Sequence, residues 1–594
     1  MNALRRYGAL LAPYRNRYLA GLSLLLATNA LSLTIPWLVK GSVDAIAAMQ
    51  AGRPVEGWLT SPWHFVGALV VIALVLAVIR TASRVVILGA GRYVARDVRE
   101  RLYQRLLEAD PSFYSRFPTG EIMSRGVSDV RMLEAVGAPG VLWGCNALFM
   151  FAIALPPMLS VSPLLTGLVL IPHPLLAGVT MWAATRVKRY SREAQEAMAE
   201  LTTHLQETLE GMHVVKAFTL EEQQAARFED ANDRYLERSM KEALTRGGIG
   251  IVAVFAAGFG TCAILWAGGR AVAQGTLTYG DLALFLSLNA MVLRPTIYLG
   301  WILSLLQRGL AALDRVDELL LAPLAVRDPE EPKASGALEG RLEVEGLTYR
   351  YPAGAEVSTR RLALDDVSFT VPPGGVLGLT GPIGSGKSTI LRAIPRFLEV
   401  PAESVRMDGV PIERWDLGDL RRGIGYVPQD GTVFSLSLGA NIAFGEPDAS
   451  EAEVTAALRA AELEKDLDQL DDGLETLVGE RGVTLSGGQR QRLAIARALL
   501  IKPRVLLLDD ALSMVDAETA VAILANLRER LPGTTVVVSA HRTATLLGAD
   551  ELLVVDRGRV VERGAPDELL SKPDSRFFAM HERQRLQSEI LESA

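Results

Sequence analysis

The sequence predicts a multi-domain membrane protein in which an all-α domain of six transmembrane helices, with long cytoplasmic helical extensions, precedes an α/β P-loop nucleotide-binding domain. Three observations predict this class. The 594-residue chain is 49% hydrophobic, and its mean hydropathy of +0.22 is positive, which indicates membrane spans. The long apolar segments all lie in the first half of the chain. A glycine-rich phosphate-binding motif lies in the second half.

Composition excludes several other classes. A net charge of −7 and a pI near 5.7 argue against a broad nucleic-acid surface, so no nucleic-acid partner is expected. The two cysteines, Cys145 and Cys262, lie in apolar segments and predict no disulfide framework. The six histidines show no metal-ligand spacing. No small-residue cleavage site follows the first apolar run, which therefore reads as an uncleaved first span.

Six apolar segments are each long enough to cross a hydrocarbon core of roughly 30 Å. The connections between them alternate: short ones are nearly free of Lys and Arg, and two long ones are rich in both. The positive-inside rule places the long connections and the N-terminus in the cytoplasm. We therefore expect a multi-pass protein of the plasma or inner membrane, with the nucleotide-binding domain in the cytoplasm. The segments are 18–46, 64–90, 138–159, 164–186, 247–274 and 281–305.

The two long connections are helical in composition, which predicts spans that continue beyond the bilayer. Each has a break, at 110–121 and at 211–218. Such tips are suited to touching a soluble domain, although a solvated hairpin is an alternative. Breaker residues mark a linker at 322–340. The expected domains are a membrane domain at 1–321, this linker, a nucleotide-binding domain at 341–574 and a C-terminal helix at 575–594.

The motif that organises the second half fits G-x-x-x-x-G-K-[ST] from Gly381 to Ser388. An apolar strand, 376–380, precedes it and a helix follows from 390. Backbone N–H groups of such a loop wrap phosphates, Lys387 reaches the β- and γ-phosphates, and Ser388 holds Mg²⁺. ATP and Mg²⁺ are therefore the expected ligands. The predicted nucleotide-binding residues of the loop are Gly381, Gly384, Ser385, Gly386, Lys387, Ser388 and Thr389.

Alternating apolar and helical runs predict a mostly parallel sheet with crossover helices. The run 505–508 ends in Asp509 and Asp510, at the edge where the second half of a P-loop site belongs. Asp509 is expected to hold Mg²⁺. Ser450 and Glu453 predict a capping box at a helix start.

Between these motifs lies Leu485-Ser-Gly-Gly-Gln489, and with it the chain resembles the ATP-binding cassette (ABC) family over almost its whole length. The resemblance implies roles for further residues. Tyr351 is placed like the aromatic that stacks on adenine, and Gln429 like the glutamine that contacts Mg²⁺. His541 matches the switch histidine that contacts the γ-phosphate. The D-loop aspartate corresponds to Asp516, and the signature residues that complete an ATP site are Ser486, Gly487, Gly488 and Gln489.

Six spans followed by one cassette resemble an exporter half-transporter. By that resemblance two halves assemble, and each ATP lies between the P-loop of one chain and the LSGGQ signature of the other. The breaks at 117–121 and near Gly211 resemble the two coupling helices of these exporters, which favours them over solvated hairpins.

The chain departs from the family pattern at two places. Asp510 stands where the family usually has the glutamate that acts as general base, and Ser513-Met-Val-Asp516 replaces the usual D-loop. Because the signature is intact, the chain looks like the degenerate-site subunit of a heterodimeric multidrug or peptide exporter. Its own site is then weakly active, and its partner carries the catalytic glutamate. A homodimer that uses Asp510 as a slow base is the alternative.

The expected function is ATP-driven export of hydrophobic or amphipathic substrates such as drugs, peptides or lipids. A lipid flippase of the same architecture is the main alternative; an ATP-gated channel is a further one, and the six spans argue strongly against a soluble ABC protein. Arg294 and Asn289 in the sixth span are the candidates for the substrate path, with Arg80 a weaker one. We also expect a C-terminal helix at 575–593 to pack on the partner's tail.

Overall fold

The computed structural model describes residues 3–593 except 53, 56–60, 333–335, 352–361, 468–469, 471 and 480–484. The chain divides into two compact units. The first comprises Met1–Leu107 and Gly120–Ala322, and the second Glu108–Thr119 and Pro323–Ala594. The domain boundaries expected from the sequence stay predictions. One segment lies in a different unit from the one expected: residues 108–119, within the predicted membrane domain, group with the second unit.

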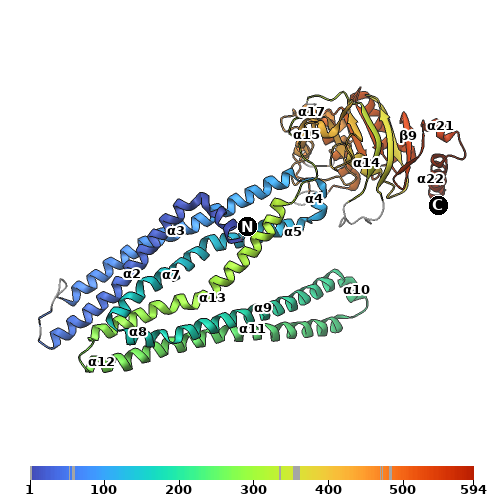
Figure 1. Ribbon diagram of the computed structural model, residues 1–594. Coiled ribbons are helices and arrows are strands. Elements are labelled where there is room, and N and C mark those ends of the chain that lie inside the picture. The colour runs from blue at the N-terminus through green and yellow to red at the C-terminus, as the bar shows by residue number, and fades with distance from the viewer. Residues whose placement is uncertain are drawn as a thin grey trace. The chain divides into compact units, whose positions relative to one another are not determined.

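The first unit is built of long helices (Figure 1). Helices α9 and α11 lie side by side and meet at α10, and α13 packs on α2, α7 and α9. Three short π-helical segments, η2 to η4, interrupt the helices. The helices are α1 (Ala3–Leu11), α2 (Arg15–Gln50), α3 (Pro62–Glu108), α5 (Thr119–Ser124), α6 (Val130–Ala135), α7 (Val141–Val161), α8 (Pro163–Leu170), α9 (Pro172–Glu210), α10 (Met212–Ala217), α11 (Glu221–Ala263), α12 (Gly269–Ala273) and α13 (Tyr279–Leu321).

The six predicted spans are confirmed in part. Among the described residues, five continuous helical stretches are long and apolar enough to cross a membrane: Ala3–Gln50, Trp63–Glu108, Thr119–Val161, Pro163–Glu210 and Glu221–Ala273. The sixth expected span appears as a shorter apolar segment, Tyr279–Leu293, at the start of α13. The six-span count therefore stays a prediction.

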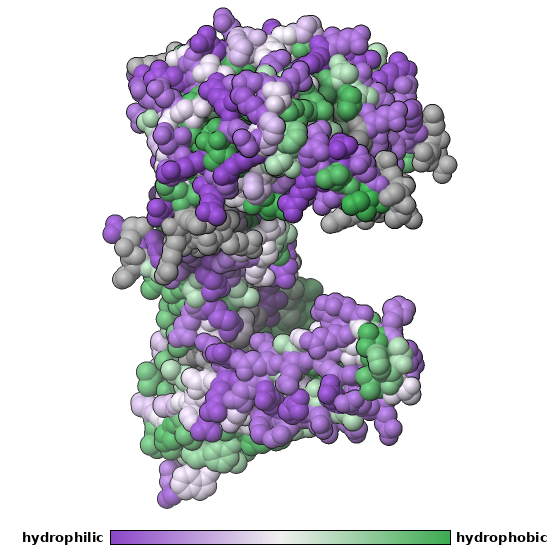
Figure 2. Space-filling model, turned by 90° about the vertical axis from the view of Figure 1, so that its right-hand side faces the viewer, coloured by the Kyte–Doolittle hydropathy of each residue, from purple (hydrophilic) through white to green (hydrophobic). Residues whose placement is uncertain are grey.

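Several helices are much longer than a bilayer needs. Helix α2 has 36 residues and α3 has 47, whereas about 20 residues cross a hydrocarbon core. The ends of α9 and α11 that meet at α10 turn toward the viewer in Figure 2, and the surface there is mostly hydrophilic. These lengths agree with helices that extend beyond a membrane, while the side on which they emerge stays a prediction.

Breaks occur at both tips where the sequence predicts them. Helix α3 ends at Glu108 and α4 (Pro111–Arg116) follows it. Asp110 is the N-cap of α4, where its Oδ1 accepts the Ser112 N–H at 2.9 Å and the Phe113 N–H at 3.3 Å. At the other tip α9 ends before Gly211, and α10 follows.

The second unit contains two sheets. A six-stranded sheet has the order β10-β9-β3-β8-β7-β6 and is parallel except for β10. A four-stranded antiparallel sheet has the order β2-β1-β4-β5 and was not predicted. The strands are β1 (Leu342–Tyr349), β2 (Leu364–Val371), β3 (Val376–Thr380), β4 (Val405–Met407), β5 (Val410–Pro411), β6 (Ile424–Val427), β7 (Val505–Asp509), β8 (Thr535–Ser539), β9 (Glu551–Asp556) and β10 (Arg559–Gly564).

The parallel strands are buried on both faces of the sheet. Successive side chains of a strand point to opposite faces, so one strand contributes to a core on each side. Val505 and Leu507 of β7 belong to one hydrophobic core, and Leu506 and Leu508 to another. The predicted capping box of Ser450 and Glu453 is confirmed at the start of α17. The helices of this unit are α4, α14 (Lys387–Ala393), α15 (Leu417–Arg422), α16 (Leu438–Ile442), α17 (Glu451–Ala460), α18 (Glu464–Leu467), α19 (Gly487–Leu500), α20 (Ala517–Arg530), α21 (Pro566–Leu570) and α22 (Arg576–Ser593).

Candidate functional site

The P-loop follows β3 and leads into α14, the strand–loop–helix order that the motif predicts. Two of its glycines have no substitute. Gly381 has φ +142°, and a Cβ there would lie 2.0 Å from the carbonyl oxygen of Val555 on β9. Gly386 has φ +112°, and its Cβ would lie 2.7 Å from the Ala363 carbonyl oxygen. At both positions the loop backbone passes so close to the backbone of a neighbouring segment that only glycine fits.

Lys387 is held inside the loop. It is 5% exposed, and its Nζ donates to the carbonyl oxygens of Gly381 at 2.9 Å and Pro382 at 3.0 Å. Burial lowers the pKa of this ammonium, and the nearby carboxylates of Asp510 and Asp509 oppose that effect. Its Nζ also donates to Ser385 Oγ at 3.5 Å, so its described hydrogen-bond partners all belong to the loop, and the ammonium is placed to meet a phosphate that enters the loop.

The acid at the end of β7 meets the P-loop directly. Ser388 Oγ donates to Asp509 Oδ1 at 2.7 Å, and Asp509 is 1% exposed. The Tyr426 hydroxyl, at the end of β6, donates to Asp509 Oδ2 at 3.1 Å. Burial, with the adjacent Asp509 charge, raises the pKa of Tyr426 to about 12, so the phenol stays a donor at neutral pH. A role for Tyr426 was not predicted, although its position three residues before Gln429 was a signal.

Asp510 lies beside the switch segment, residues 541–543, which begins with His541. Its backbone has φ +50°, which is uncommon for a residue with a side chain, and Asp510 is 8% exposed. Burial raises the pKa of its carboxyl group, and the His541 backbone N–H, which hydrogen-bonds to it, opposes the rise. A carboxyl group with a raised pKa is suited to accept a proton. The structure thus brings Asp510 and His541 together.

Two further predicted residues lie at the edges of this site. The Tyr351 hydroxyl is 3.2 Å from Thr389 Oγ1, next to the P-loop serine. Gln429 has an exposed side chain, and its carbonyl oxygen accepts a hydrogen bond from Gln491 Nε2 at 3.3 Å. Asp516 is the N-cap of α20 and accepts the Thr519 N–H at 2.9 Å, so its described contact is structural.

The signature residues form the start of α19. Ser486 and Gln489 make a reciprocal capping box there. Gly487 and Gly488 face the D-loop, since Cβ atoms would lie 2.5 Å from Met514 Sδ and 2.9 Å from the Met514 carbonyl oxygen respectively. Among the described residues, no hydrogen bond joins 485–489 to 381–389. The signature therefore does not complete the P-loop of its own chain through such a bond.

Gln491, two residues after the signature, ties three of these parts together. It is 1% exposed, and its Nε2 donates to Ser513 Oγ at 3.0 Å and to the Asp510 carbonyl oxygen at 3.4 Å. Its Oε1 accepts the Met514 N–H at 2.9 Å. This role of Gln491 was not predicted, because its contacts join segments about 20 to 60 residues apart.

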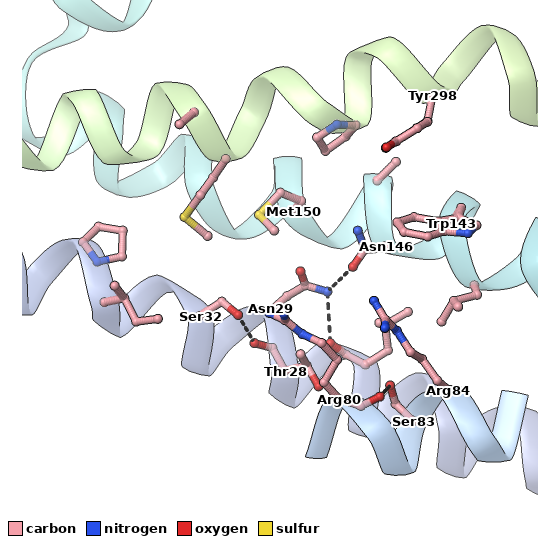
Figure 3. A pocket seen from close by; sticks show the side chains of 18 of the residues that line it. Thr28, Asn29, Ser32, Arg80, Ser83, Arg84, Trp143, Asn146, Met150 and Tyr298 are labelled. Carbon is pink, nitrogen blue, oxygen red and sulfur yellow. Dashed lines mark hydrogen bonds between the residues drawn. The ribbon is translucent and has the colours of Figure 1, made fainter. Parts of the chain in front are cut away.

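The first unit contains a second candidate site, a cavity of about 570 Å³ (Figure 3). It lies among α2, α3, α7 and α13. Its walls combine apolar and aromatic side chains with hydroxyls, amides and two arginines. The principal polar and aromatic lining residues are Thr28, Asn29, Ser32, Arg80, Ser83, Arg84, Trp143, Asn146 and Tyr298.

Polar groups in this cavity are partly paired. Asn29 Nδ2 donates to Asn146 Oδ1 at 3.1 Å, which joins α2 to α7. The rings of Trp143 and Tyr298 lie 5.4 Å apart. A mixture of aromatic surface and a few placed polar groups is typical of small-molecule sites.

The two predicted substrate-path residues are not described in this cavity. Asn289 is 4% exposed and faces α11, where a Cβ on Gly260 would lie 2.8 Å from Asn289 Oδ1. Arg294 belongs to α13, but its side chain is outside the part that the structure describes. Its neighbour Pro295 does line the cavity, as does Arg80, the weaker candidate.

Comparison with known proteins identifies the family of both parts of the chain. Residues 18–296 match the family model of the ABC transporter transmembrane region, and residues 364–513 match the model named ABC transporter. The chain is 34% identical to the probable multidrug resistance ABC transporter ATP-binding/permease protein YheI of Bacillus subtilis (strain 168), over 98% of each chain. It is 34% identical to the multidrug resistance-like ATP-binding protein MdlA of Escherichia coli (strain K12), over 97% of this chain and 95% of that one.

One solved structure is similar over nearly the whole length. It is described as a bacterial Atm1-family ABC exporter with ATP bound. The TM-score is 0.75 at 26% identity, covering 96% of this chain and 99% of the other.

Proposed function

The chain belongs to the ABC transporter family, and from this premise we propose that it is one half of an ATP-driven exporter of hydrophobic or amphipathic compounds in the cell membrane. The observation that carries the proposal is the hydrogen bond between Ser388 of the glycine-lined P-loop and Asp509. Transport and ATP hydrolysis then reside in different units of one chain.

The residues at the P-loop fit Mg²⁺ together with a nucleotide. Ser388 Oγ and the Asp509 carboxylate are hard oxygen donors, which Mg²⁺ prefers, and they lie 2.7 Å apart. Mg²⁺ neutralises phosphate charge when it is bound. Lys387 is placed for the phosphates, Tyr351 for the base and Gln429 for the metal, as the family resemblance implies. Asp510 and His541 are the groups that would act on the attacking water and the γ-phosphate.

A second half-transporter is part of the proposal. The capped start of α19 offers backbone N–H groups of a 14-residue helix. It is not joined by hydrogen bonds to the P-loop of the same chain among the described residues. This is consistent with the proposal that the signature serves the P-loop of another chain.

Asp510 favours a partner that differs from this chain. Its side chain is one methylene shorter than that of glutamate, so its carboxylate falls roughly 1.5 Å short of the usual place. Misplacement by about 1 Å can cost on the order of 10²-fold in rate. A partner that carries glutamate would restore turnover at the site that this chain's intact signature completes. A homodimer with Asp510 as a slow base is the alternative.

The two tips fit a coupling role in different ways. The tip at 108–119 groups with the nucleotide-binding unit of its own chain. The tip at α10 groups with the helical unit and exposes two apolar side chains, with Val214 57% and Phe218 71% accessible. An exposed apolar tip at the end of a long hairpin is suited to a partner's nucleotide-binding unit.

The cavity among α2, α3, α7 and α13 is the proposed contact surface for substrate. Its aromatic and methionine side chains suit the apolar part of an amphipathic compound, and its hydroxyls and amides suit the polar part. Arg294 and Asn289 stay proposals for the substrate path, and Arg80 and Arg84 join them on the strength of the cavity's lining.

Reconstitution tests this function. The chain and any partner that co-purifies with it are placed in liposomes, and ATP-dependent movement is measured for ethidium, a dansyl-labelled peptide and a fluorescent phospholipid. We expect transport of at least one of the first two, lost with Lys387→Ala and retained with Arg528→Ala, a charge change at an exposed position of α20. Movement of the phospholipid alone would favour a flippase. ATP hydrolysis without movement of any probe would contradict export.

A further inference from the structure

The C-terminal helix α22 forms hydrogen bonds with the segment that carries the switch histidine, His541. Gln584 Nε2 donates to the carbonyl oxygen of His541 at 2.7 Å. Its Oε1 accepts the backbone N–H of Thr543 at 2.9 Å. One amide side chain thus holds the backbone at His541 itself and two residues further on, so the segment between these two bonds has little freedom to rotate.

The side chain of Thr543 strengthens this contact. Its hydroxyl donates to Gln584 Oε1 at 3.0 Å and lies 3.0 Å from His581 Nδ1. A hydroxyl has one proton, so His581 Nδ1 is the donor in the second bond. Thr543 is 1% exposed, which protects the contact from water. Two side chains of α22, one turn apart, therefore act on the same threonine.

Helix α22 is attached to its unit independently of Gln584. The Glu562 carboxylate on β10 accepts the backbone N–H groups of Arg576 and Phe577, each at 3.0 Å. Phe577 is fully buried in a hydrophobic core of the unit. Arg576 also pairs with Asp556 at 2.8 Å. Replacement of Gln584 therefore leaves the start of the helix docked.

The switch segment is also held from its other side. The Arg542 guanidinium donates to the carbonyl oxygen of Val515, in the D-loop, at 2.7 Å. The His541 N–H faces the Asp510 carboxylate. With Gln584 on one side and the D-loop on the other, the backbone that orients the His541 ring is fixed between two parts of the chain that lie far apart in sequence.

We propose that Gln584 is a positioning residue for His541, through which the C-terminal helix sets how this chain's own site distinguishes ATP from ADP. The inference rests on the proposed function, in which His541 contacts the γ-phosphate. ADP lacks that group. Loosening the His541 segment should therefore weaken ATP binding and leave ADP binding unchanged, whereas a general disturbance of the unit would weaken both.

Photolabelling of the assembled transporter with 8-azido-ATP tests the proposal, because labelling of each chain is resolved on a gel. ATP and ADP serve as competitors. For Gln584→Ala we expect the half-saturating ATP concentration at this chain to rise about tenfold, with the ADP value unchanged. This is the effect of losing one charge-assisted hydrogen bond, here the one between His541 and the γ-phosphate. Gln587→Ala is the matched control, since Gln587 is an exposed glutamine on the same helix.

Each outcome decides. The proposal would be overturned if the half-saturating ATP concentration, like that of ADP, were the same in Gln584→Ala as in Gln587→Ala and the unchanged protein. It would also be overturned if Gln584→Ala weakened the binding of ATP and ADP to the same extent. If the unchanged protein is not labelled on this chain at all, the proposed ATP site itself fails. Hydrogen exchange provides the second measurement: Gln584→Ala should speed exchange at 541–543 and not at 576–578. Protection that is unchanged at 541–543 would also overturn the proposal.

Discussion

Asp110 is predicted to attach the first tip to the nucleotide-binding unit, and Asp110→Ala tests this. One carboxylate oxygen caps α4, and the other, Oδ2, accepts the backbone N–H groups of Ala325 at 2.9 Å and Val326 at 3.4 Å. Loss of an N-cap costs about 1 kcal/mol, and a hydrogen bond to a charged group contributes about 1.5–3 kcal/mol. The change should therefore lower the free energy of local unfolding at this contact by about 3 kcal/mol.

At about 1.4 kcal/mol per tenfold change, that decrease corresponds to roughly 10²-fold more frequent local opening. Hydrogen exchange by mass spectrometry should show this acceleration in peptides that contain 112–113 and 325–326. Asp328→Ala is a matched control, because the Asp328 carboxylate accepts the Leu417 N–H at 2.8 Å instead. Unchanged exchange at 325–326 in Asp110→Ala would refute the reasoning.

The same carboxylate predicts a pH dependence. Burial alone would raise the pKa of Asp110, but the hydrogen bonds from Ser112 and from the Ala325 and Val326 backbones outweigh it and leave the pKa below its ordinary value. A carboxyl group with a depressed folded-state pKa stabilises the fold above its unfolded-state pKa, near 4. The Asp110 contribution should therefore be complete at neutral pH and be lost only as the pH falls below about 4. Protection at 325–326 that already declines between pH 7 and 5 would contradict this.

The remaining predictions concern the two candidate sites. Ser388→Ala removes the hydroxyl paired with Asp509, so Mg²⁺ should no longer strengthen nucleotide binding, and an unchanged effect of EDTA would contradict this. Gly381→Ala places a Cβ 2.0 Å from the Val555 carbonyl oxygen, so the midpoint of thermal unfolding should fall, and an unchanged midpoint would show that the loop has room. Arg294→Ala should alter the preference among transported compounds at normal expression, and unchanged transport of every probe would remove Arg294 from the substrate path.

The strand, loop and helix around the P-loop could be predicted because each motif is a short continuous stretch of sequence. The P-loop and the acid pair carry their own strand and helix signals, and the structure brings Ser388, Asp509 and Asp510 to one edge of a parallel sheet. The contacts that support the site could not be predicted. Gln491 and Gln584 bind backbone groups of distant segments, and no local pattern records such a pairing.

The antiparallel sheet was missed for a different reason. The turn between β4 and β5 contains Asp408 and Gly409 with positive φ, and Asp-Gly is a hairpin signal that was present in the sequence. The lining of the membrane cavity is a further case. Apolar spans have weak periodicity, so which helix faces the cavity depends on helix packing, and Asn29, Asn146 and Arg84 were found only in the structure.

The central claim concerns the two ATP sites of the proposed assembly. The site at this chain's own P-loop, with Asp510, is proposed to hydrolyse ATP slowly, and this chain's signature is proposed to complete the faster site at the partner's P-loop. Steady-state ATPase activity of the assembled transporter, measured for Asp510→Ala and Gly488→Asp, tests it most directly. Gly488→Ala is the control, because a Cβ at this position already lies 2.9 Å from the Met514 carbonyl oxygen without adding a charge. We predict a modest change for Asp510→Ala and near loss of activity for Gly488→Asp, well beyond that of the control. If Asp510→Ala abolishes turnover while Gly488→Asp is tolerated, the division of labour is contradicted and Asp510 is the base of a productive site.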